Sequence, residues 1–471
     1  MHQIEQIFIN GEFVTPHGTE WFDLYNPATA QVIGQVRLAD EVDAERAVAA
    51  AKAAFPAWSQ TTKQERIAAL KRMHAAVAAR HDDLLEAVIE EYGAPASRSA
   101  WMASYPAEVI AQAIEALEAF EFVIPAGAAT VQMTPLGVAG LITPWNSDAG
   151  FICGKLVVAL AAGCTAVIKP SEMSALQTRI VTEALRDAAL PPGVFNIVTG
   201  RGETVGDTIS RHPDVAKISF TGSTNTGKAI LRNAAESFKR VTLELGGKSP
   251  TILLDDVDLA QAIPLVIQAG FMNSGQACVA GTRILVPYSR KAEIETALAQ
   301  AVAAVKSGDP RNSTTDVGPM VSEKQWLRVQ GYIRKGIEEG ARLLAGGEGR
   351  PDGTRDGWFV RPTLFADVNN RMTIARDEIF GPVLCVIPYQ DEAEAIAIAN
   401  DTEYGLSAMV LGCDVARARR VAQQIVSGRV LVNTLAHEPK APFGGFKHSG
   451  VGREMGEWGI RAFMEPRSIL G

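Results

Sequence analysis

Residues 137–172 read GVAGLITPWNSDAGFICGKLVVALAAGCTAVIKPSE, and this stretch decides the fold. Two short apolar runs with strand-like composition, residues 137–143 and 165–169, flank an apolar stretch of helical length at residues 151–162. A strand, a helix and a strand in this order predict two parallel strands joined by a crossover helix. Both strands end in polar or proline-containing segments, where ligands of parallel sheets bind.

The same rhythm continues along the chain and predicts an α/β fold with a Rossmann-like parallel sheet. Strand-like runs lie at residues 194–199, 217–221 and 240–245, and helical patterns at residues 175–189 and 226–235 separate them. Such alternation predicts helices on both faces of the sheet.

Three helices are expected before this sheet. Asp40 can cap the first, and a capping box from Thr62 to Glu65 starts a second that should run to Tyr92. A third is expected at residues 105–122.

A second α/β pattern follows the first. Its expected strands and helix are, in order, residues 250–254, 283–286, 291–306 (the helix), 383–388 and 408–411. We therefore expect a nucleotide-binding domain from residues 1–122 and 136–245, a second α/β catalytic domain from residues 246–430, a small oligomerisation arm from residues 123–135 and 455–471, and a segment at the mouth of the site from residues 431–454.

The expected arm is apolar and leaves the rhythm of the sheet. Pro125 and Gly127 interrupt residues 123–135, which could pair with residues 461–470 and reach another subunit. An ordinary peripheral hairpin is equally compatible with the pattern.

Composition limits the classes of function. The formal charge of −8, with 21% charged and 47% hydrophobic residues, argues against nucleic acid or an anionic membrane as a partner. The N-terminus lacks the layout of a signal peptide, and Gly154, Lys155 and Gly163 interrupt the longest apolar stretch, so no membrane span is expected. The seven histidines show no HExxH or Cys/His spacing, so no metal site is expected.

The cysteines favour a reducing, cytoplasmic location. There are five, none in CxxC spacing, and their odd number suits free thiols better than a disulfide framework. Four are expected to be inert and buried: Cys153, Cys164, Cys385 and Cys413.

Two further residues can carry chemistry. Cys278 lies in GQACVAGTR (residues 275–283), where small neighbours can expose the sulfur to a substrate. Glu244 lies in ELGGKS (residues 244–249) at the end of an expected strand, where partial desolvation raises a carboxylate toward general-base use. Each signal alone is weak, since an inert thiol and a solvated glutamate are common.

A nucleotide-binding P-loop is a rival interpretation. Residues from Gly222 to Lys228 match GxxxxGK, but the next residue is Ala229 where a metal-binding Ser or Thr is required. A strand–glycine–helix turn that binds a dinucleotide pyrophosphate needs no such residue. Gly200, Gly202 and Gly206 form a near miss to GxGxxG, for which a plain loop is the simpler account.

Taken together, these segments resemble the aldehyde dehydrogenase superfamily over nearly the whole chain. Seven landmarks carry the resemblance: PWN at 144–146, KPSE at 169–172, FTGST at 220–224, ELGGK at 244–248, GQAC at 275–278, EIFGP at 378–382 and PFGGFK at 442–447, the last continuing through 449–454. Glu244 and Cys278 are 34 residues apart (278 − 244), as in the family.

The resemblance implies a reaction. The Cys278 thiolate would attack an aldehyde, the Asn146 amide and the Cys278 backbone N–H would hold the oxyanion, and a thioester would follow hydride transfer to NAD(P). Glu244 would activate the water that hydrolyses the thioester. Lys155 and Glu454 match proton-relay positions, and a structural ion pair is as good an account of them.

The resemblance also implies cofactor contacts. Lys169 and Glu172 would bind the adenosine ribose, the helix beginning near Ser223 the pyrophosphate, and Glu378 and Phe380 the nicotinamide end. The full expected set is Ile142, Pro144, Trp145, Lys169, Ser171, Glu172, Gly202, Gly206, Phe220, Thr221, Gly222, Ser223, Leu245, Gly246, Glu378 and Phe380. Since the Glu172 carboxylate repels a 2′-phosphate, NAD is expected over NADP, although Lys169 leaves NADP possible.

The chain departs from the family pattern after Asn146, where Ser147 and Asp148 replace an aromatic residue and a proline, and the shape of the oxyanion loop is left open. Ser147, Gly150, Phe151 and Gly154 share one helical face, and three of the four are small. We expect this face to widen the substrate tunnel for a bulky or elongated aldehyde.

The opposite wall of the tunnel is expected to be polar. It includes Leu435, His437, Glu438, Lys440 and Phe443. His437 and Lys440 could bind a substrate carboxylate, although a solvated loop is the simpler account.

Two more rivals remain at this point. A CoA-acylating relative can dispense with Glu244, and a thiol hydrolase needs a histidine partner that no motif supplies. The fold resemblance favours a homodimer or a dimer of dimers with exchanged arms.

Overall fold

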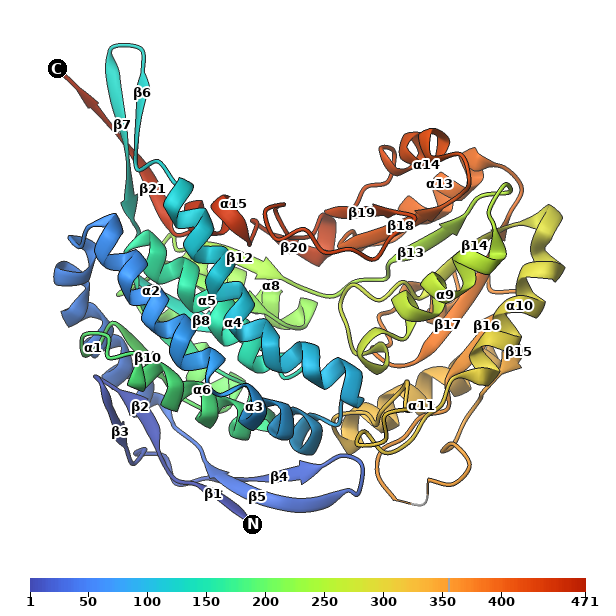
Figure 1. The fold of residues 1–471 in the computed structure, drawn as a ribbon, viewed down its shortest axis with the longest axis horizontal. Coiled ribbons are helices and arrows are strands. Elements are labelled where there is room, and N and C mark those ends of the chain that lie inside the picture. The colour runs from blue at the N-terminus through green and yellow to red at the C-terminus, as the bar shows by residue number, and fades with distance from the viewer. Residues whose placement is uncertain (355) are drawn as a thin grey trace.

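The structure, a computed structural model, describes residues 1–354 and 356–471. Two α/β bodies lie side by side, and the connection from β12 to β13 crosses between them (Figure 1). The first body is built on an eight-stranded sheet in the order β20-β12-β11-β8-β9-β10-β2-β3. Its strands are β2 (Ile7–Ile9), β3 (Glu12–Val14), β8 (Val138–Ile142), β9 (Thr165–Lys169), β10 (Phe195–Ile197), β11 (Val215–Thr221), β12 (Arg240–Glu244) and β20 (Gly450–Val451).

The five central strands, β12 to β10, are parallel and coincide with the five predicted runs. The antiparallel edge strands β2, β3 and β20 were not predicted. The helices of this body are α1 (Glu41–Ser59), α2 (Lys63–Ala78), α3 (His81–Ala87), η1 (Val88–Tyr92), α4 (Ala96–Ala119), α5 (Asp148–Ala162), α6 (Ala175–Asp187), α7 (Asp207–Arg211) and α8 (Thr224–Ala235).

Helix caps were predicted better than helix lengths. Asp40 and Thr62 each form the expected capping box. The helix predicted to run from Thr62 to Tyr92 is instead three helical segments, because α2 ends at Ala78. The prediction of a third helix starting at residue 105 was also wrong, since α4 begins at Ala96 and continues through Pro106.

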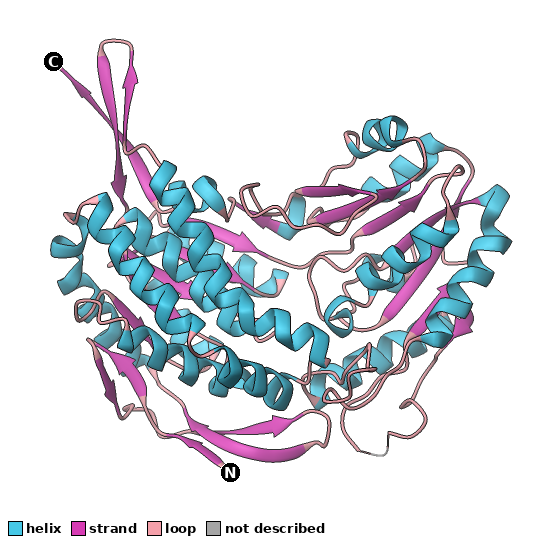
Figure 2. Ribbon diagram, in the orientation of Figure 1, coloured by secondary structure: helices cyan, strands magenta, loops and turns pink. Residues whose placement is uncertain are grey.

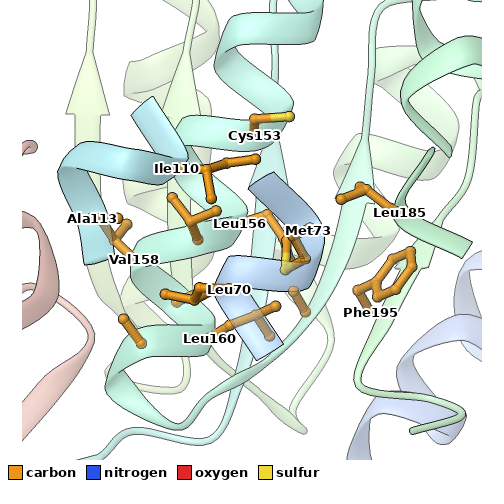
Figure 3. Close-up of a cluster of buried hydrophobic side chains, with 14 of the residues drawn as sticks. Leu70, Met73, Ile110, Ala113, Cys153, Leu156, Val158, Leu160, Leu185 and Phe195 are labelled. Carbon is orange, nitrogen blue, oxygen red and sulfur yellow. The ribbon is translucent and has the colours of Figure 1, made fainter. Parts of the chain in front are cut away.

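Helix α5 is the centre of the first body. Almost all its side chains are buried, and Leu156 and Leu160 pack with Leu70 and Met73 of α2 (Figure 3). A helix that is apolar on all sides belongs in a core, and each such buried side chain contributes about 1.5–3 kcal/mol. This packing fixes the loop that precedes α5, which carries Asn146.

The second body is built on a seven-stranded sheet in the order β15-β16-β17-β14-β13-β18-β19. Its strands are β13 (Pro250–Leu253), β14 (Arg283–Pro287), β15 (Arg342–Ala345), β16 (Thr363–Ala366), β17 (Val383–Tyr389), β18 (Ser407–Leu411) and β19 (Arg429–Val432), and its helices are α9 (Leu259–Gly270), α10 (Lys291–Ala304), α11 (Glu323–Glu338), α12 (Thr373–Arg376), α13 (Glu392–Asn400) and α14 (Val415–Ala422). The four predicted strands are present and parallel, whereas β15, β16 and β19 were not predicted. Strand β19 crosses residue 430, where a boundary was expected.

Three strands project from the first body as an arm (Figures 1 and 2). They are β6 (Val123–Ala126), β7 (Ala129–Pro135) and β21 (Met464–Leu470), and β21 pairs antiparallel with β7 along its whole length. Helix α15 (Gly456–Arg461) instead packs on α4 and α5, so residues 456–461 lie on the body rather than in the arm.

A small sheet of β1 (His2–Ile4), β4 (Trp21–Asn26) and β5 (Gln31–Arg37) completes the fold. Within residues 1–354 and 356–471, no helix has both the length and the apolar character that crossing a membrane requires.

Candidate active site

The candidate site lies where the two sheets meet. The first sheet contributes the carboxyl ends of its strands: Asn146 follows β8, and Glu244 ends β12. The second sheet contributes the segments before its strands: Cys278 precedes β14, and Glu378 precedes β17. The groups of the cleft therefore come from the carboxyl ends of the strands in the first sheet and from the amino ends of the strands in the second.

The loop carrying Cys278 has an unusual backbone. Asn273 and Ser274 adopt left-handed conformations with φ of 54° and 59°. At Gly275 a Cβ would lie 2.2 Å from the Gly381 carbonyl carbon, so only glycine allows this close approach. Cys278 itself is partly exposed to the cleft. Strain of this kind is held by surrounding structure and is typical of functional sites.

Asn146 joins this loop to the first sheet. Its side-chain amide donates to the Gln276 carbonyl at 3.0 Å, and the Asn273 amide donates to the Asn146 carbonyl at 3.0 Å. A primary amide has two N–H donors, so one remains beyond the Gln276 contact. The donor predicted for the oxyanion is thus held next to the nucleophile's loop.

Asp148, whose effect on this loop the sequence left open, anchors it. The buried carboxylate accepts hydrogen bonds from the Thr143 hydroxyl at 2.9 Å and the Thr178 hydroxyl at 2.8 Å. Burial raises the pKa of Asp148 to about 7. The carboxylate therefore ties the start of α5 to the end of β8 and to α6.

Glu244 is placed as a base. The residue is only 3% exposed, and neither carboxylate oxygen has a hydrogen-bond partner within the described residues. Burial, and secondarily the Glu454 carboxylate, raise its pKa well above the ordinary value, and Lys155 and Arg453 oppose that rise. A carboxylate with a raised pKa in a cleft is suited to accept a proton near neutral pH.

The surroundings of Cys278 favour the thiol over the thiolate. Burial, and then the Glu378 and Glu244 carboxylates, raise its pKa to about 12, and Arg429 opposes the rise. The thiolate is the nucleophile, so the reaction needs a group that takes the thiol proton. Glu244 lines the same cleft.

Lys155 and Glu454 meet, as predicted. The Lys155 ammonium donates to Glu454 Oε1 at 2.5 Å and to the Ser219 hydroxyl at 3.0 Å. Ser219 also donates to Glu454 at 2.9 Å. This network adjoins Glu244. The Glu454 carboxylate raises the pKa of Glu244, and the Lys155 ammonium lowers it.

The cleft has the size and lining for a dinucleotide. It measures about 730 Å³. Thirteen predicted site residues line it: Pro144, Trp145, Asn146, Glu172, Thr221, Gly222, Ser223, Glu244, Leu245, Gly246, Cys278, Glu378 and Phe380. The lining also includes residues that were not predicted: Phe22, Met173, Arg201, Val321, Ser322, Lys324, Gln325 and Arg328.

At one end of the cleft, three charged side chains interact. Glu172 accepts from Lys169 at 3.4 Å and from Arg201 at 3.5 Å, and Arg201 also pairs with Glu20 at 2.7 Å. Ser171 caps the short helix that carries Glu172. Arg201 gave no sequence signal, because it reaches Glu172 from a segment 29 residues away.

Next along the cleft lies the start of α8. Ser223 caps this helix by accepting from the Thr226 N–H at 3.2 Å, and Gly222 and Ser223 both line the cleft. The Thr221 hydroxyl is buried without a partner in the described structure. Phe220, which was also predicted to contact the cofactor, is buried in the core.

Three other predicted cofactor residues, Ile142, Gly202 and Gly206, are not among the residues that line the cleft. Gly206 is the end of a short π-helical turn and packs against the side chains of Lys169 and Ile142. Gly202 begins that turn in open space.

At the other end, Glu378 and Phe380 approach Cys278. Glu378 accepts the Gly247 N–H at 2.9 Å, and burial raises its pKa to about 7. At Gly246 a Cβ would lie 2.4 Å from Glu378, so this position also requires glycine. The Phe380 ring meets Trp145 edge to face at 5.4 Å.

The expected wide tunnel is wrong at Gly150. A Cβ there would lie 2.6 Å from Cδ1 of Tyr105, so an aromatic side chain from α4 fills the space that the glycine leaves. At Gly154 a Cβ would lie in ordinary van der Waals contact with Val109, 3.9 Å away, so it would fit without a clash. Phe151 is half-buried, and the Ser147 hydroxyl is buried without a partner in the described structure.

The opposite wall holds an unpredicted cation. Phe443 lies under Arg429, whose guanidinium carbon is 5.9 Å from the ring centre. His437 is exposed, and Lys440 is turned to Glu115 at 3.6 Å.

Comparison with known proteins gives one family. The model of the aldehyde dehydrogenase family matches residues 13–469. A 3-succinoylsemialdehyde-pyridine dehydrogenase of a Pseudomonas species is 43% identical over 100% of this chain and 99% of its own.

Solved structures agree. A mutant of aldehyde dehydrogenase C from Pseudomonas syringae, in complex with NAD+ and octanal, superposes with a TM-score of 0.97 at 44% identity, covering 99% of this chain and 96% of that one. An aldehyde dehydrogenase of Mycobacterium tuberculosis in complex with NAD+ gives a TM-score of 0.96 at 41% identity, covering 99% and 98%. The chain therefore belongs to the aldehyde dehydrogenase family and is an NAD(P)-dependent oxidoreductase that acts on aldehydes.

Proposed function

We propose that this protein oxidises an elongated aldehyde to its carboxylic acid with NAD+, through a thiohemiacetal and a thioester on Cys278. The observation that carries the proposal is the meeting of Cys278, Asn146 and Glu244 at one end of a dinucleotide-sized cleft. Proximity of nucleophile, oxyanion donor and base is what acyl chemistry on sulfur requires.

The first step is attack on the aldehyde. Glu244, whose burial keeps its affinity for protons high, takes the Cys278 proton as the sulfur bonds to the carbonyl carbon. The Asn146 amide and the Cys278 backbone N–H hold the oxyanion, and each such donor is worth about 2.7–4 kcal/mol of barrier. Bound NAD+ supplies the hydride acceptor that turns the thiohemiacetal into a thioester.

The second step releases the acid. Glu244 takes a proton from the water that attacks the thioester, and the Lys155–Glu454 pair passes that proton on. A CoA-acylating enzyme would not need this base, so the buried, unpartnered Glu244 favours hydrolysis.

The residues of the cleft suit NAD+. The unpartnered Thr221 hydroxyl and the start of α8 offer donors to a pyrophosphate, and Glu172 offers an acceptor to the ribose hydroxyls. The Glu172 carboxylate disfavours a 2′-phosphate, whereas Lys169 and Arg201 beside it would partly offset that repulsion. We expect NAD+ to be preferred and NADP+ to be used less well.

An elongated substrate is supported by one observation. The similar enzyme from Pseudomonas syringae binds octanal.

We also propose a homodimer or a dimer of dimers. The arm exposes apolar side chains that a partner would cover, among them Val123 at 55% and Leu470 at 77% exposure. The five free cysteines are consistent with a cytoplasmic protein. Light scattering after gel filtration tests the oligomer, and removal of residues 464–471 should dissociate it.

The main test follows NAD+ reduction at 340 nm across a panel of aldehydes, without CoA, for the native enzyme and Cys278→Ala. We expect turnover by the native enzyme, none by the variant, and an acyl adduct on the Cys278 peptide by mass spectrometry after rapid quenching. Undiminished turnover by Cys278→Ala would refute the mechanism.

A further inference from the structure

Arg429 forms no ion pair with any of the described residues. It opens β19, is half-buried, and its Nε donates only to the Ser407 hydroxyl, at 3.3 Å. Throughout the part of the chain that the structure describes, no carboxylate lies within ion-pair distance of its guanidinium. Charges withdrawn from water are normally paired, because an unpaired one costs free energy.

Arg429 borders the nucleophile. Its backbone N–H donates to the Leu406 carbonyl at 3.1 Å, and Leu406 packs on Gly247. A Cβ on Gly247 would lie 3.5 Å from the Leu406 Cβ and 2.4 Å from the Cys278 carbonyl oxygen, so Gly247 lies between Leu406 and the Cys278 backbone. Consistently, the positive charge of Arg429 lowers the pKa of the Cys278 thiol, against the larger effect of burial.

Two other cations near the mouth are already occupied. Lys440, 79% exposed, pairs with Glu115. Arg453 donates to the carbonyls of Gly445 and Gly452, at 3.1 and 2.6 Å. Arg98 of α4 has no anionic partner within the described residues either, but its guanidinium is stacked on the Trp101 ring at 3.9 Å.

We propose that Arg429 binds a carboxylate at the far end of the substrate, so that the preferred substrates are aldehydes that carry an acid group on the same chain. This rests on the proposed aldehyde oxidation at Cys278. With Nε on Ser407, the two NH2 groups of the guanidinium remain to bind a carboxylate in a forked pair, which arginine does better than lysine. Phe443 beneath the guanidinium would contact the chain between the two ends of the substrate.

A different role for the same residue is to balance the Cys278 thiolate. The two roles differ in what they predict for neutral aldehydes. A carboxylate site matters only to acidic substrates, whereas a counter-ion of the thiolate matters to every substrate and to alkylation of the thiol.

The experiment uses straight-chain aldehydes that end in a carboxylate, each paired with its methyl ester. We measure kcat/KM for the native enzyme, Arg429→Gln, Arg429→Lys, Lys440→Gln at the rival cation and the matched control Arg420→Gln, an exposed arginine of α14, with thermal melts to establish folding. The native enzyme should prefer acid over ester, and Arg429→Gln should lose about 30-fold or more on the acids while changing less than about threefold on the esters. Arg429→Lys should recover part of the loss, and Arg420→Gln should behave as native.

Three results would overturn the inference. One is an equal loss on acids and esters together with slower iodoacetamide labelling of Cys278, which would assign Arg429 to the thiolate. Another is no loss on either class. The third is a loss on the acids in Lys440→Gln instead, which would place the carboxylate at the mouth. If the native enzyme oxidises no aldehyde, the proposed function itself fails, which is a separate result.

Discussion

The Asn146 side-chain amide donates a 3.0 Å hydrogen bond to the Gln276 carbonyl, two residues before Cys278. One residue comes from the carboxyl end of the first sheet and the other from the loop that leads into the second. This contact, with the return hydrogen bond from Asn273, sets the oxyanion donor and the nucleophile at a fixed separation.

Asn146→Ala should therefore slow the chemical step. We expect kcat to fall about 10²–10³-fold, because one oxyanion donor is lost, while KM changes little. Steady-state kinetics and a thermal melt measure both effects. Asn312→Ala, an exposed asparagine in a loop of the second body, is the control and should retain native kcat. A native kcat in Asn146→Ala would exclude the oxyanion role.

Glu244 should make stability depend on pH. Its pKa is raised well above 4.5, first by burial. Below the ordinary pKa both states are protonated and the shift has no effect, whereas above it only the unfolded state ionises freely, so native stability falls as pH rises. Glu244→Gln cannot ionise, so its melting temperature should exceed the native value at about pH 8 and approach it at about pH 5. The exposed Glu236→Gln should show no such trend, and a pH-independent difference would contradict the shift.

Glu172 should control cofactor choice. Glu172→Gln removes the charge that repels a 2′-phosphate and leaves Lys169 and Arg201 in place. We expect kcat/KM with NADP+ to rise about tenfold and kcat/KM with NAD+ to fall, because the amide oxygen of glutamine is a weaker, uncharged acceptor for the ribose hydroxyl. Initial rates with both cofactors at one aldehyde concentration test this, and an unchanged ratio would show that Glu172 does not face the ribose.

The fold was predictable where burial on both faces imposes a pattern. The central strands and α5 are nearly all apolar, so their sequence alone marks them. Edge strands such as β3 and β20 are short and half-exposed, and they carry no such pattern. Helix α4 was predicted to be too short, because Pro95, Pro106 and the small residues between them resemble a loop until packing against α5 is known.

The site was predictable where its residues lie in motifs. Cys278, Glu244 and Asn146 were found in this way, and they border one cleft. Tyr105, Arg201 and Arg429 were missed because each reaches the site from a segment without a motif. The Tyr105 ring fills the space that the missing side chain of Gly150 leaves, so the width of a tunnel cannot be predicted from the residues of one wall.

Variants can show whether Lys155 and Glu454 relay a proton or form only a structural ion pair. Lys155 is 2% exposed and Glu454 is 20% exposed, so Lys155→Met alone should cost about 1–3 kcal/mol by leaving the partly buried Glu454 carboxylate with only the Ser219 hydroxyl. The double variant Lys155→Met with Glu454→Leu should recover much of that stability, since two apolar groups replace the pair. We predict that kcat stays low in the double variant, because the proton path is missing. Recovery of kcat together with stability would assign the pair a structural role only.

Asp148 should position Asn146 without touching the substrate. Asp148→Ala leaves the Thr143 and Thr178 hydroxyls without their acceptor inside the core, which costs roughly 1–3 kcal/mol for each. The start of α5 then loosens, and because Asn146 lies just before it, kcat should fall more than KM rises. In Asp148→Asn, one threonine hydroxyl can donate to the amide oxygen and the other can rotate to accept from the amide NH2. This variant should therefore recover most of the stability and most of kcat. Thr178→Val removes one of the two contacts and should fall between them. If Asp148→Ala melts at the native temperature with native kcat, the loop is held by the Gln276 contact alone, and the departure from the family pattern at residue 148 has no consequence for catalysis.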